Sequence, residues 1–244
     1  MNSIDLIDFY KIVYSQHGQD GILEKIFDCI GTVNKQFVEF GSCGMKTGQG
    51  NTIYLRENFG WSGLLMDGSE YPYGIKIQKD YEVKIHFVKA SNINSLLQKY
   101  NVSKELDFMS IDIDGQDWHV WKAIDDTLFR PRVICIETSW DMYGDRDLVM
   151  KPDEDYIWDG TYLSGSSLLA LQRLGNSKGY TLVSMVGADA IFVRADILIE
   201  KGIQFINQDN AYELWQANPD CRIRGNIQDD YTSCGNFGTS SDFL

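Results

Sequence analysis

The stretch FVEFGSCG at residues 37–44, together with GLLMD at residues 63–67, decides the fold of this chain. An apolar run breaks into a loop with four glycines, a helix signal follows at Asn51, and a second apolar run ends on Asp67. This order predicts strand, tight loop, helix and strand, which is the first half of a nucleoside-binding α/β unit. Glycines let backbone amides approach a ligand because no Cβ intervenes. A carboxylate after the second strand can accept hydrogen bonds from ribose hydroxyls.

The glycine spacing distinguishes between two kinds of nucleotide ligand. A dinucleotide site requires G-x-G-x-x-G and a helix N-terminus aimed at a pyrophosphate. The glycines here follow the spacing G-x-x-G-x-x-x-G-x-G, and Glu39 lies just before the loop. A carboxylate in that place would repel a pyrophosphate but suit a cationic ligand. S-adenosylmethionine (SAM) combines adenosine with an amino acid and a sulfonium, so these residues predict a SAM site and a methyltransferase.

Composition narrows the class of protein further. The 244 residues suffice for one sizeable domain, and 43% of them are hydrophobic, as is ordinary for a globular core. The net charge is −13 and no dense Lys/Arg run occurs, so we expect no nucleic-acid partner. No apolar stretch reaches membrane-spanning length, and the N-terminus lacks the pattern of a signal peptide. The five cysteines form no C-x-x-C pair, which favours free thiols in the cytoplasm.

Strand and helix signals alternate from residue 36 onward. The expected strands are 36–40, 63–67, 84–88, 106–111 and 132–137. The expected helices are 20–30, 51–58, 73–79, 92–100, 116–124 and 166–178. Asp20 is the expected N-cap of the first helix and Gly31 its end. A hairpin of 180–186 and 190–194 completes a mostly parallel seven-stranded α/β sheet with helices on both faces.

We expect one structural domain with three parts. Residues 1–35 form a lid and helix, and residues 36–206 form the SAM-binding core. Within the core, the acidic insertion 139–162 is expected on the acceptor side, where Trp158 or Trp140 could stack on a sugar or base. Residues 207–244 are a polar tail that either covers the site or is loosely ordered.

Carboxylates follow two further predicted strands. Asp112 and Asp114 come after the fourth strand, and Glu137 ends the fifth. Unpaired carboxylates brought together repel one another unless a proton or cation is shared, and hard oxygen ligands suit Mg²⁺ or Mn²⁺. We therefore predict a divalent-metal site formed by these three residues. The alternative is that Asp112 contacts only SAM, Asp114 caps the next helix and Glu137 bonds local backbone.

Two other polar segments supply candidates for binding and proton transfer. SQHGQD at residues 15–20 is interpreted either as a turn with a helix cap or as a lid over the methyl donor, through which Gln16, His17 or Gln19 touches SAM or acceptor. His17 and His119 are the candidate general bases, since neutral imidazole is common in that role. Asp114 is a third candidate. The Ala90-Ser91-Asn92 loop either lies beside the adenine or caps a helix.

In this order and spacing, five motifs resemble one known family. SQHGQD, FVEFGSCG followed by NT, GWSGLLMDG, DFMSIDIDG and RPRVICIE together resemble the FkbM-like SAM-dependent methyltransferases, over about Ser15 to Arg194. The resemblance implies a class I Rossmann-like fold and O-methylation, often of sugars or polyketide-derived products. Many members read IDVEG where this chain has IDIDG at residues 111–115, so the second carboxylate is one methylene shorter. The acidic insertion and the tail match no family pattern.

The residues and the resemblance together define the expected site and reaction. The expected SAM contacts are Gln19, Glu39, Gly41, Ser42, Asn51, Thr52, Asp67, Gly68, Ser69, Ala90, Ser91, Asn92 and Asp112. The expected reaction is metal-assisted transfer of a methyl group from SAM to a hydroxyl of a sugar. That sugar is a nucleotide-linked heptose or hexose, or a glycan of a bacterial capsule or surface polysaccharide.

Other readings of the sequence stay open. The first is an O-methyltransferase that acts on natural products. A SAM- or glycan-binding protein without turnover and a nicotinamide-dependent sugar oxidoreductase belong to different classes, and the glycine spacing disfavours the latter. The sequence is compatible with a homo-oligomer as well as with a monomer.

Overall fold

The computed structural model describes residues 3–41, 50–68, 82–139, 141–161, 164–220 and 235–244. Several residues singled out above lie outside these ranges. They include residues 42–49 of the glycine loop with the expected SAM contact Ser42, the expected SAM contact Ser69, the expected helix 73–79, Trp140 and residues 221–234 of the tail.

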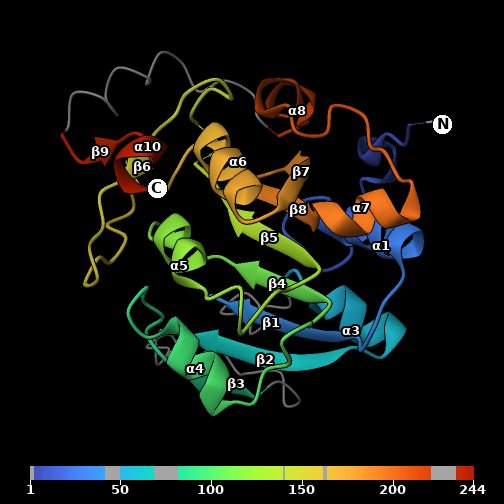
Figure 1. Cartoon of the computed structure of the whole chain (residues 1–244), viewed down its shortest axis with the longest axis horizontal. Coiled ribbons are helices and arrows are strands. Elements are labelled where there is room, and N and C mark those ends of the chain that lie inside the picture. The colour runs from blue at the N-terminus through green and yellow to red at the C-terminus, as the bar shows by residue number, and fades with distance from the viewer. Residues whose placement is uncertain (1–2, 42–49, 69–81, 140, 162–163, 221–234) are drawn as a thin grey trace.

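A seven-stranded mixed sheet forms the centre of the protein, which confirms the α/β class (Figure 1). Its strands are β1 (Gln36–Phe40), β2 (Ser62–Asp67), β3 (Val83–Ile85), β4 (Phe108–Ile111), β5 (Val133–Glu137), β7 (Tyr180–Val186) and β8 (Asp189–Arg194). They lie in the order β3-β2-β1-β4-β5-β8-β7. In this described sheet β8 runs antiparallel to both of its neighbours, β5 and β7, and the other four pairings are parallel, so the sheet is mostly parallel, as predicted.

The strand order reverses between β1 and β4. From β1 the chain moves outward to β2 and β3, then returns to β4 on the other side of β1. In open α/β sheets, ligands bind outside the carboxyl ends of the strands at such a reversal. The topology therefore predicts a ligand site at the carboxyl ends of β1 and β4.

The helices pack on both faces of the sheet, as predicted (Figure 1). One core lies between the sheet and α4 (Ile93–Lys99), α5 (Asp117–Ala123), α6 (Leu168–Ser177) and α8 (Ala211–Ala217). The opposite core includes η1 (Leu6–Phe9), α1 (Gln19–Ile30), α3 (Ile53–Phe59) and α7 (Ala195–Lys201). Burial of apolar side chains on both faces supplies the driving force for this three-layer arrangement.

The start of α1 differs from the prediction. Gly18, not Asp20, is the N-cap, whereas Gly31 ends the helix with a φ of 69° as expected. Asp20 lies inside the first turn, and its Oδ2 accepts hydrogen bonds from the backbone N–H groups of Val13, Tyr14 and Ser15 at 2.8, 2.7 and 2.9 Å. Asp20 therefore stabilises the loop before the helix rather than the helix end.

The described parts of the C-terminal tail pack against the acidic insertion. Strand β9 (Phe237–Gly238) pairs with β6 (Val149–Met150) in a two-stranded antiparallel sheet. After it, α10 (Ser240–Phe243) places the Phe243 ring 6.2 Å from Trp118 and 5.4 Å from His119, measured between ring centroids. The end of the chain thus covers the insertion and the outer side of α5.

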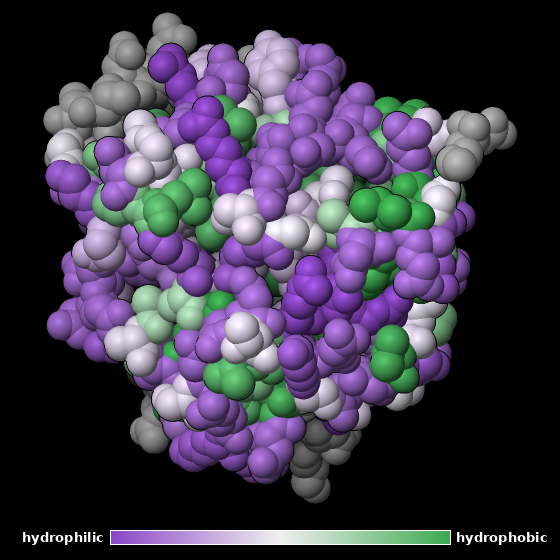
Figure 2. Space-filling view, viewed as in Figure 1, coloured by the Kyte–Doolittle hydropathy of each residue, from purple (hydrophilic) through white to green (hydrophobic). Residues whose placement is uncertain are grey.

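The surface seen in Figure 2 is dominated by hydrophilic residues, with apolar residues in separate small areas. None of the helices in the described ranges combines the length and the apolar character that crossing a membrane would require.

Candidate functional site

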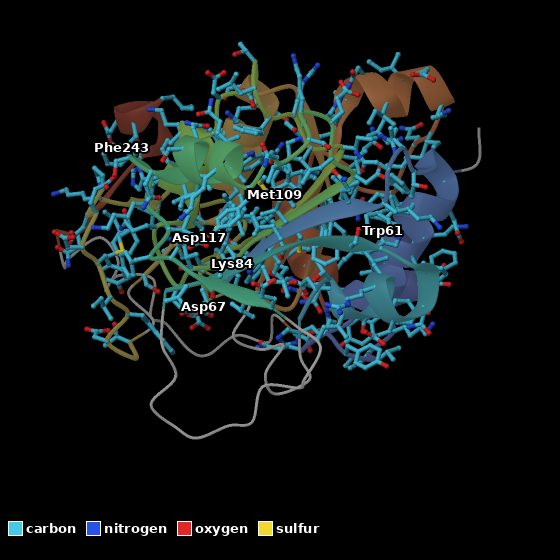
Figure 3. The ribbon with its side chains drawn as sticks, turned by 90° about the horizontal axis from the view of Figure 1, so that it is seen from below. Trp61, Asp67, Lys84, Met109, Asp117 and Phe243 are labelled. Atoms are coloured by element: carbon cyan, nitrogen blue, oxygen red, sulfur yellow. The ribbon has the colours of Figure 1, made fainter. Side chains whose placement is uncertain are left out.

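A cavity of about 570 Å³ lies at the carboxyl ends of the parallel strands. Its walls come from the ends of β1, β2, β4 and β5, the loop before α4, the segment before α1, the acidic insertion and the turn between β7 and β8. In Figure 3, Asp67 and Asp117 lie toward one end of the strands, and Trp61, which precedes β2, lies toward the opposite end. A cavity of this volume is in the range of small-molecule sites.

Glu39 ties the end of β1 to the start of α3. Its buried carboxylate accepts a hydrogen bond from the backbone N–H of Asn51 at 3.1 Å and another from the Thr52 hydroxyl. Burial removes water from the carboxylate and is the main reason that the pKa of Glu39 rises to about 7. The residue lines the cavity, but it also occupies the donors at the start of the helix.

Gly41 lets the ends of β1 and β4 approach each other. Its φ is 68°, and a Cβ at this position would lie 1.6 Å from the backbone carbonyl oxygen of Asp112. No side chain fits there, so glycine is required by both the left-handed conformation and the close approach.

Most of the expected SAM contacts that the structure describes line this one cavity. They are Gln19, Glu39, Gly41, Asn51, Asp67, Gly68, Ala90 and Asp112. Asp67 is buried at the end of β2, which is where the sequence placed a partner for a ribose.

Three other expected SAM contacts lie outside the cavity lining and have local partners instead. Thr52 is buried and donates to Glu39. The backbone N–H of Ser91 donates to Glu154 Oε1 at 3.0 Å, and its hydroxyl donates to the same carboxylate. Asn92 closes its own loop by accepting from the Lys89 N–H and donating to the Phe87 carbonyl, both at 2.9 Å.

The ends of β4 and β5 bring together Asp112, Asp114 and Glu137, here called the acidic triad. Each offers a carboxylate oxygen, and these atoms lie within 4.8 Å of one another. Within the described residues, none of the three side chains makes a hydrogen bond or an ion pair. Burial, followed by the charge of neighbouring carboxylates, raises the pKa of Asp112 and of Glu137 well above the ordinary range. Three hard oxygen donors with no protein partner fit a divalent cation.

Asp117 orients the loop after β4, which carries Asp112 and Asp114 of the acidic triad. Its buried carboxylate accepts from the backbone N–H groups of Ile113 and Gly115, each at 2.8 Å. Desolvation is the main cause that raises its pKa to about 7. The sequence analysis did not single out Asp117, although an Asp shortly after a glycine at a helix start is a recognisable signal for such a turn.

Asp189 is a second carboxylate that the sequence analysis missed. It lies opposite Glu137 in the β5–β8 register and is buried at the cavity. Its Oδ2 accepts from the side-chain amides of Gln19 at 2.5 Å and Asn51 at 3.2 Å. Because β8 is antiparallel to β5, its first residue lies beside the last residue of β5. The predicted hairpin implied an antiparallel last strand, so it could have indicated that Asp189 lies at this edge of the sheet.

His17 reaches the cavity from the segment before α1. Its Nδ1 lies 3.2 Å from Asp220 Oδ2, so this nitrogen donates to the carboxylate and Nε2 is left as the acceptor. The ring lies against Gly187, where a Cβ would come within 2.1 Å of His17 Cδ2. Sequence reasoning identified His17 but not Asp220, since nothing near either residue indicates that they meet.

His119 also lines the cavity, but its ring is fixed by packing. Nε2 lies 2.7 Å from the Met150 carbonyl and therefore carries the proton that it donates. Burial is the main cause that lowers the pKa of His119, which keeps the imidazole neutral. The ring packs edge-on against Trp118 and Phe243. Its Nε2 cannot accept a proton from a substrate.

The acidic insertion forms one wall of the cavity. Lys89 pairs with Asp155 at 2.7 Å, and the Asp153 N–H donates to the side chain of Gln116 at 3.0 Å. Tyr156 lies against Gly115, where a Cβ would be 2.6 Å from the tyrosine ring. Trp158 lines the same cavity and is 49% exposed. The insertion thus contacts the loop that follows β3 and the loop that follows β4.

No known family model matches the chain, and no curated protein matches it.

Proposed function

We propose that this protein is a SAM-dependent O-methyltransferase with a Rossmann-like class I fold. The observation that carries the proposal is the division of one cavity into two sides. Asp67, at the end of β2, lies on one side, and the acidic triad lies on the other, where the strand order reverses. A carboxylate positioned for a ribose, with a cluster of carboxylates in the same cavity, supports binding of a methyl donor next to a hydroxyl acceptor.

The donor side has groups for each part of SAM. Asp67 can accept from the ribose hydroxyls, and the loop at Ala90 can lie beside the adenine. Glu39, Gln19 and Asn51 line the same cavity and would lie beside the methionine portion. SAM supplies an electrophilic methyl group, which an acceptor oxygen takes in an in-line displacement that releases S-adenosylhomocysteine.

The acceptor side has groups to hold and deprotonate a hydroxyl. The acidic triad would hold Mg²⁺ or Mn²⁺, and such an ion lowers the pKa of a hydroxyl near it. His17 Nε2 receives the hydroxyl proton, and Asp220 stabilises the resulting imidazolium. The proposed acceptor is a sugar hydroxyl, and Trp158, which lines the cavity, would stack on the sugar ring.

The oxidoreductase alternative is disfavoured by two observations. The backbone N–H of Asn51, at the start of the helix after β1, is already bonded to Glu39, so this helix start is unsuited to a pyrophosphate. The one Tyr-x-x-x-Lys spacing in the sequence is Tyr100 and Lys104. Neither lines the cavity, and the Tyr100 hydroxyl is 2.6 Å from His86 Nε2.

The decisive experiment combines ligand binding with methyl transfer. Thermal-shift titrations with SAM, S-adenosylhomocysteine and NADH test the ligand class, and we expect stabilisation by the first two compounds only. Transfer of a labelled methyl group to a panel of sugars, glycans and nucleotide sugars is then measured after chelation and again with added Mn²⁺. We expect Mn²⁺ to restore turnover. Stabilisation by NADH but not by SAM would overturn the proposal, and full turnover after exhaustive chelation would overturn its metal-assisted part.

A further inference from the structure

The proposed base His17 is held between two segments that lie far from it in the sequence. Its ring lies against Gly187, in the turn between β7 and β8, and its Nδ1 lies 3.2 Å from Asp220 Oδ2, after α8. The Tyr10 hydroxyl donates to the same carboxylate oxygen at 3.4 Å. The orientation of the imidazole therefore depends on how the turn and the segment after α8 are fixed relative to each other.

Gly187 forms the surface on which the imidazole packs. Its φ is 58°, and a Cβ at this position would lie 2.1 Å from His17 Cδ2 and 2.3 Å from Cγ. Because the backbone of the turn touches the ring directly, a shift of the turn would move the ring or release it. The contacts that hold the Gly187 backbone therefore decide where the imidazole lies.

The side chain of Asn218 bonds both the N–H and the carbonyl of Gly187. Its Oδ1 accepts from the Gly187 N–H at 3.1 Å, and its Nδ2 donates to the Gly187 carbonyl at 2.8 Å. The same Oδ1 accepts from the backbone N–H of Asp220 at 3.2 Å. Asn218 is 4% exposed, so water competes little for these bonds. A single amide thus connects the two residues that contact the His17 ring.

Asn218 is itself fixed by the hydrophobic core. It follows α8 directly, and its backbone N–H donates to the Leu214 and Trp215 carbonyls at 3.1 and 3.3 Å. Both of these side chains are buried where α8 packs beside α6 and β7 (Figure 1). Because interiors are close-packed, moving the Asn218 amide would require repacking of that core. The surroundings of His17 are therefore attached to a rigid part of the fold.

We propose that Asn218 is a positioning residue for the general base. Its amide holds Gly187 and Asp220 around His17, so that Nδ1 keeps its proton and Nε2 remains the acceptor. The inference rests on the proposed function, because methyl transfer is the reaction that uses His17 as a base. Asn218 is not among the described residues that line the cavity, so its effect on the reaction passes through His17.

The three bonds require an amide. An amide carries a donor and an acceptor on one planar group, whereas aspartate of the same shape offers only acceptors and leucine of similar size offers neither. Asn218→Asp keeps the two acceptor bonds but loses the bond to the Gly187 carbonyl and places a second carboxylate near Asp220. Asn218→Leu loses all three bonds. The two variants therefore form a graded series.

The first test measures kcat for labelled-methyl transfer in this series. We expect kcat to fall by about fivefold in Asn218→Asp and by about thirtyfold in Asn218→Leu, because a misplaced base reacts slowly. The affinity for S-adenosylhomocysteine should change by less than about twofold. In the His17→Ala background, neither change should add a further loss. Losses of the same size with and without the His17 side chain would overturn the inference, since Asn218 would then act independently of the base.

Asn210→Leu is the matched control, at the opposite end of α8. Asn210 is the exposed N-cap of this helix, and its side chain accepts from the Glu213 N–H at 3.2 Å. The same substitution there weakens the helix without touching the turn or Asp220. We expect wild-type kcat in Asn210→Leu, and an equal loss in both leucine variants would contradict the inference. Urea unfolding checks that each variant is folded, and Asn218→Asp, which keeps two bonds, carries the test if Asn218→Leu does not fold.

The second test needs neither turnover nor a known acceptor. Nitrogen-15 NMR of protein labelled at its three histidines reports which ring nitrogen carries the proton, and the His17 signals are those that are lost in His17→Ala. The spectra are recorded at a pH at which free imidazole is neutral. We expect His17 to be protonated on Nδ1 in the wild type and partly on Nε2 in Asn218→Leu. An unchanged Nδ1–H signal in Asn218→Leu would overturn the inference.

Failure of the inference differs from failure of the proposed function. If SAM does not stabilise the protein and no acceptor is methylated, the methyltransferase proposal falls, while the NMR comparison still decides whether Asn218 orients His17. If methyl transfer is observed but Asn218→Leu keeps the wild-type kcat, the positioning role alone is overturned.

Discussion

Two groups of carboxylates lie at the same edge of the sheet and have opposite surroundings. Glu39, Asp117 and Asp189 each accept hydrogen bonds from nearby amides. The acidic triad accepts none from the described residues, and its oxygens lie within 4.8 Å of one another. The difference teaches that the supply of nearby donors, not residue type, separates carboxylates with hydrogen-bonding partners from carboxylates without them.

The largest expected effect follows from neutralising one member of the triad. Glu137→Gln should lower kcat for methyl transfer by about a thousandfold, because a neutral amide is a poor ligand for a divalent cation. The affinity for S-adenosylhomocysteine, measured by calorimetry, should change by less than about twofold. Glu200→Gln is the matched control, because Glu200 is exposed on α7 and lies outside the cavity lining. A wild-type kcat in Glu137→Gln would show that the acidic triad takes no part in the reaction.

The second-largest effect is expected on stability, at the contact between Gly41 after β1 and Asp112 after β4. Gly41→Ala places a methyl group against the Asp112 carbonyl and should lower the free energy of unfolding by about 3 kcal/mol. Gly60→Ala is the control, because its φ of 71° is similar but a Cβ there meets no atom within 4 Å. Gly60→Ala should lower the free energy of unfolding by only about 1 kcal/mol, because alanine disfavours the left-handed backbone conformation. Equal losses in urea unfolding would show that the close approach has no effect.

A smaller effect is expected at the histidine. Asp220→Asn should lower kcat by about tenfold, because His17 loses the carboxylate that orients it. In the double variant with His17→Ala, the Asp220 change should add no further loss. Additive losses would mean that Asp220 acts independently of His17.

The smallest expected effect is a change in the pH dependence of stability, caused by Asp117, which accepts hydrogen bonds from backbone N–H groups. Burial raises the pKa of Asp117 to about 7 from its ordinary 3.8, so the folded protein keeps a proton that the unfolded chain has released. The stabilisation is therefore present at low pH and is lost as the pH rises through 7. Between about pH 5.5 and about pH 8, the free energy of unfolding should fall by about 1 kcal/mol less in Asp117→Asn than in the wild type.

Asp125→Asn is the control for this pH dependence. A hydrogen bond from the Thr127 hydroxyl is the main cause that lowers the pKa of Asp125. Its contribution is therefore lost only as the pH falls below the ordinary carboxyl range, and the variant should not alter the slope between about pH 5.5 and about pH 8. If the free energy of unfolding depends on pH in Asp117→Asn as it does in the wild type, the assignment of the buried proton to Asp117 is contradicted.

Residues that follow a strand were predictable, and residues brought in from other segments were not. Asp67, Asp112 and Glu137 each follow an apolar run, so their place at the sheet edge follows from the strand alone. Asp189 and Asp220 contact Gln19 and His17 across most of the length of the chain. Such contacts depend on β8 lying beside β5 and on the tail returning to the N-terminal segment.

The sequence by itself determined the alternation of strands and helices, the glycine that follows β1 at position 41 and the carboxylates at the strand ends. These are local properties of residue periodicity and backbone freedom, and they need no partner elsewhere in the chain. The tertiary structure alone decided which carboxylates accept hydrogen bonds and which stay open. That outcome depends on where helix starts and distant side chains deliver their donors once all the layers have packed.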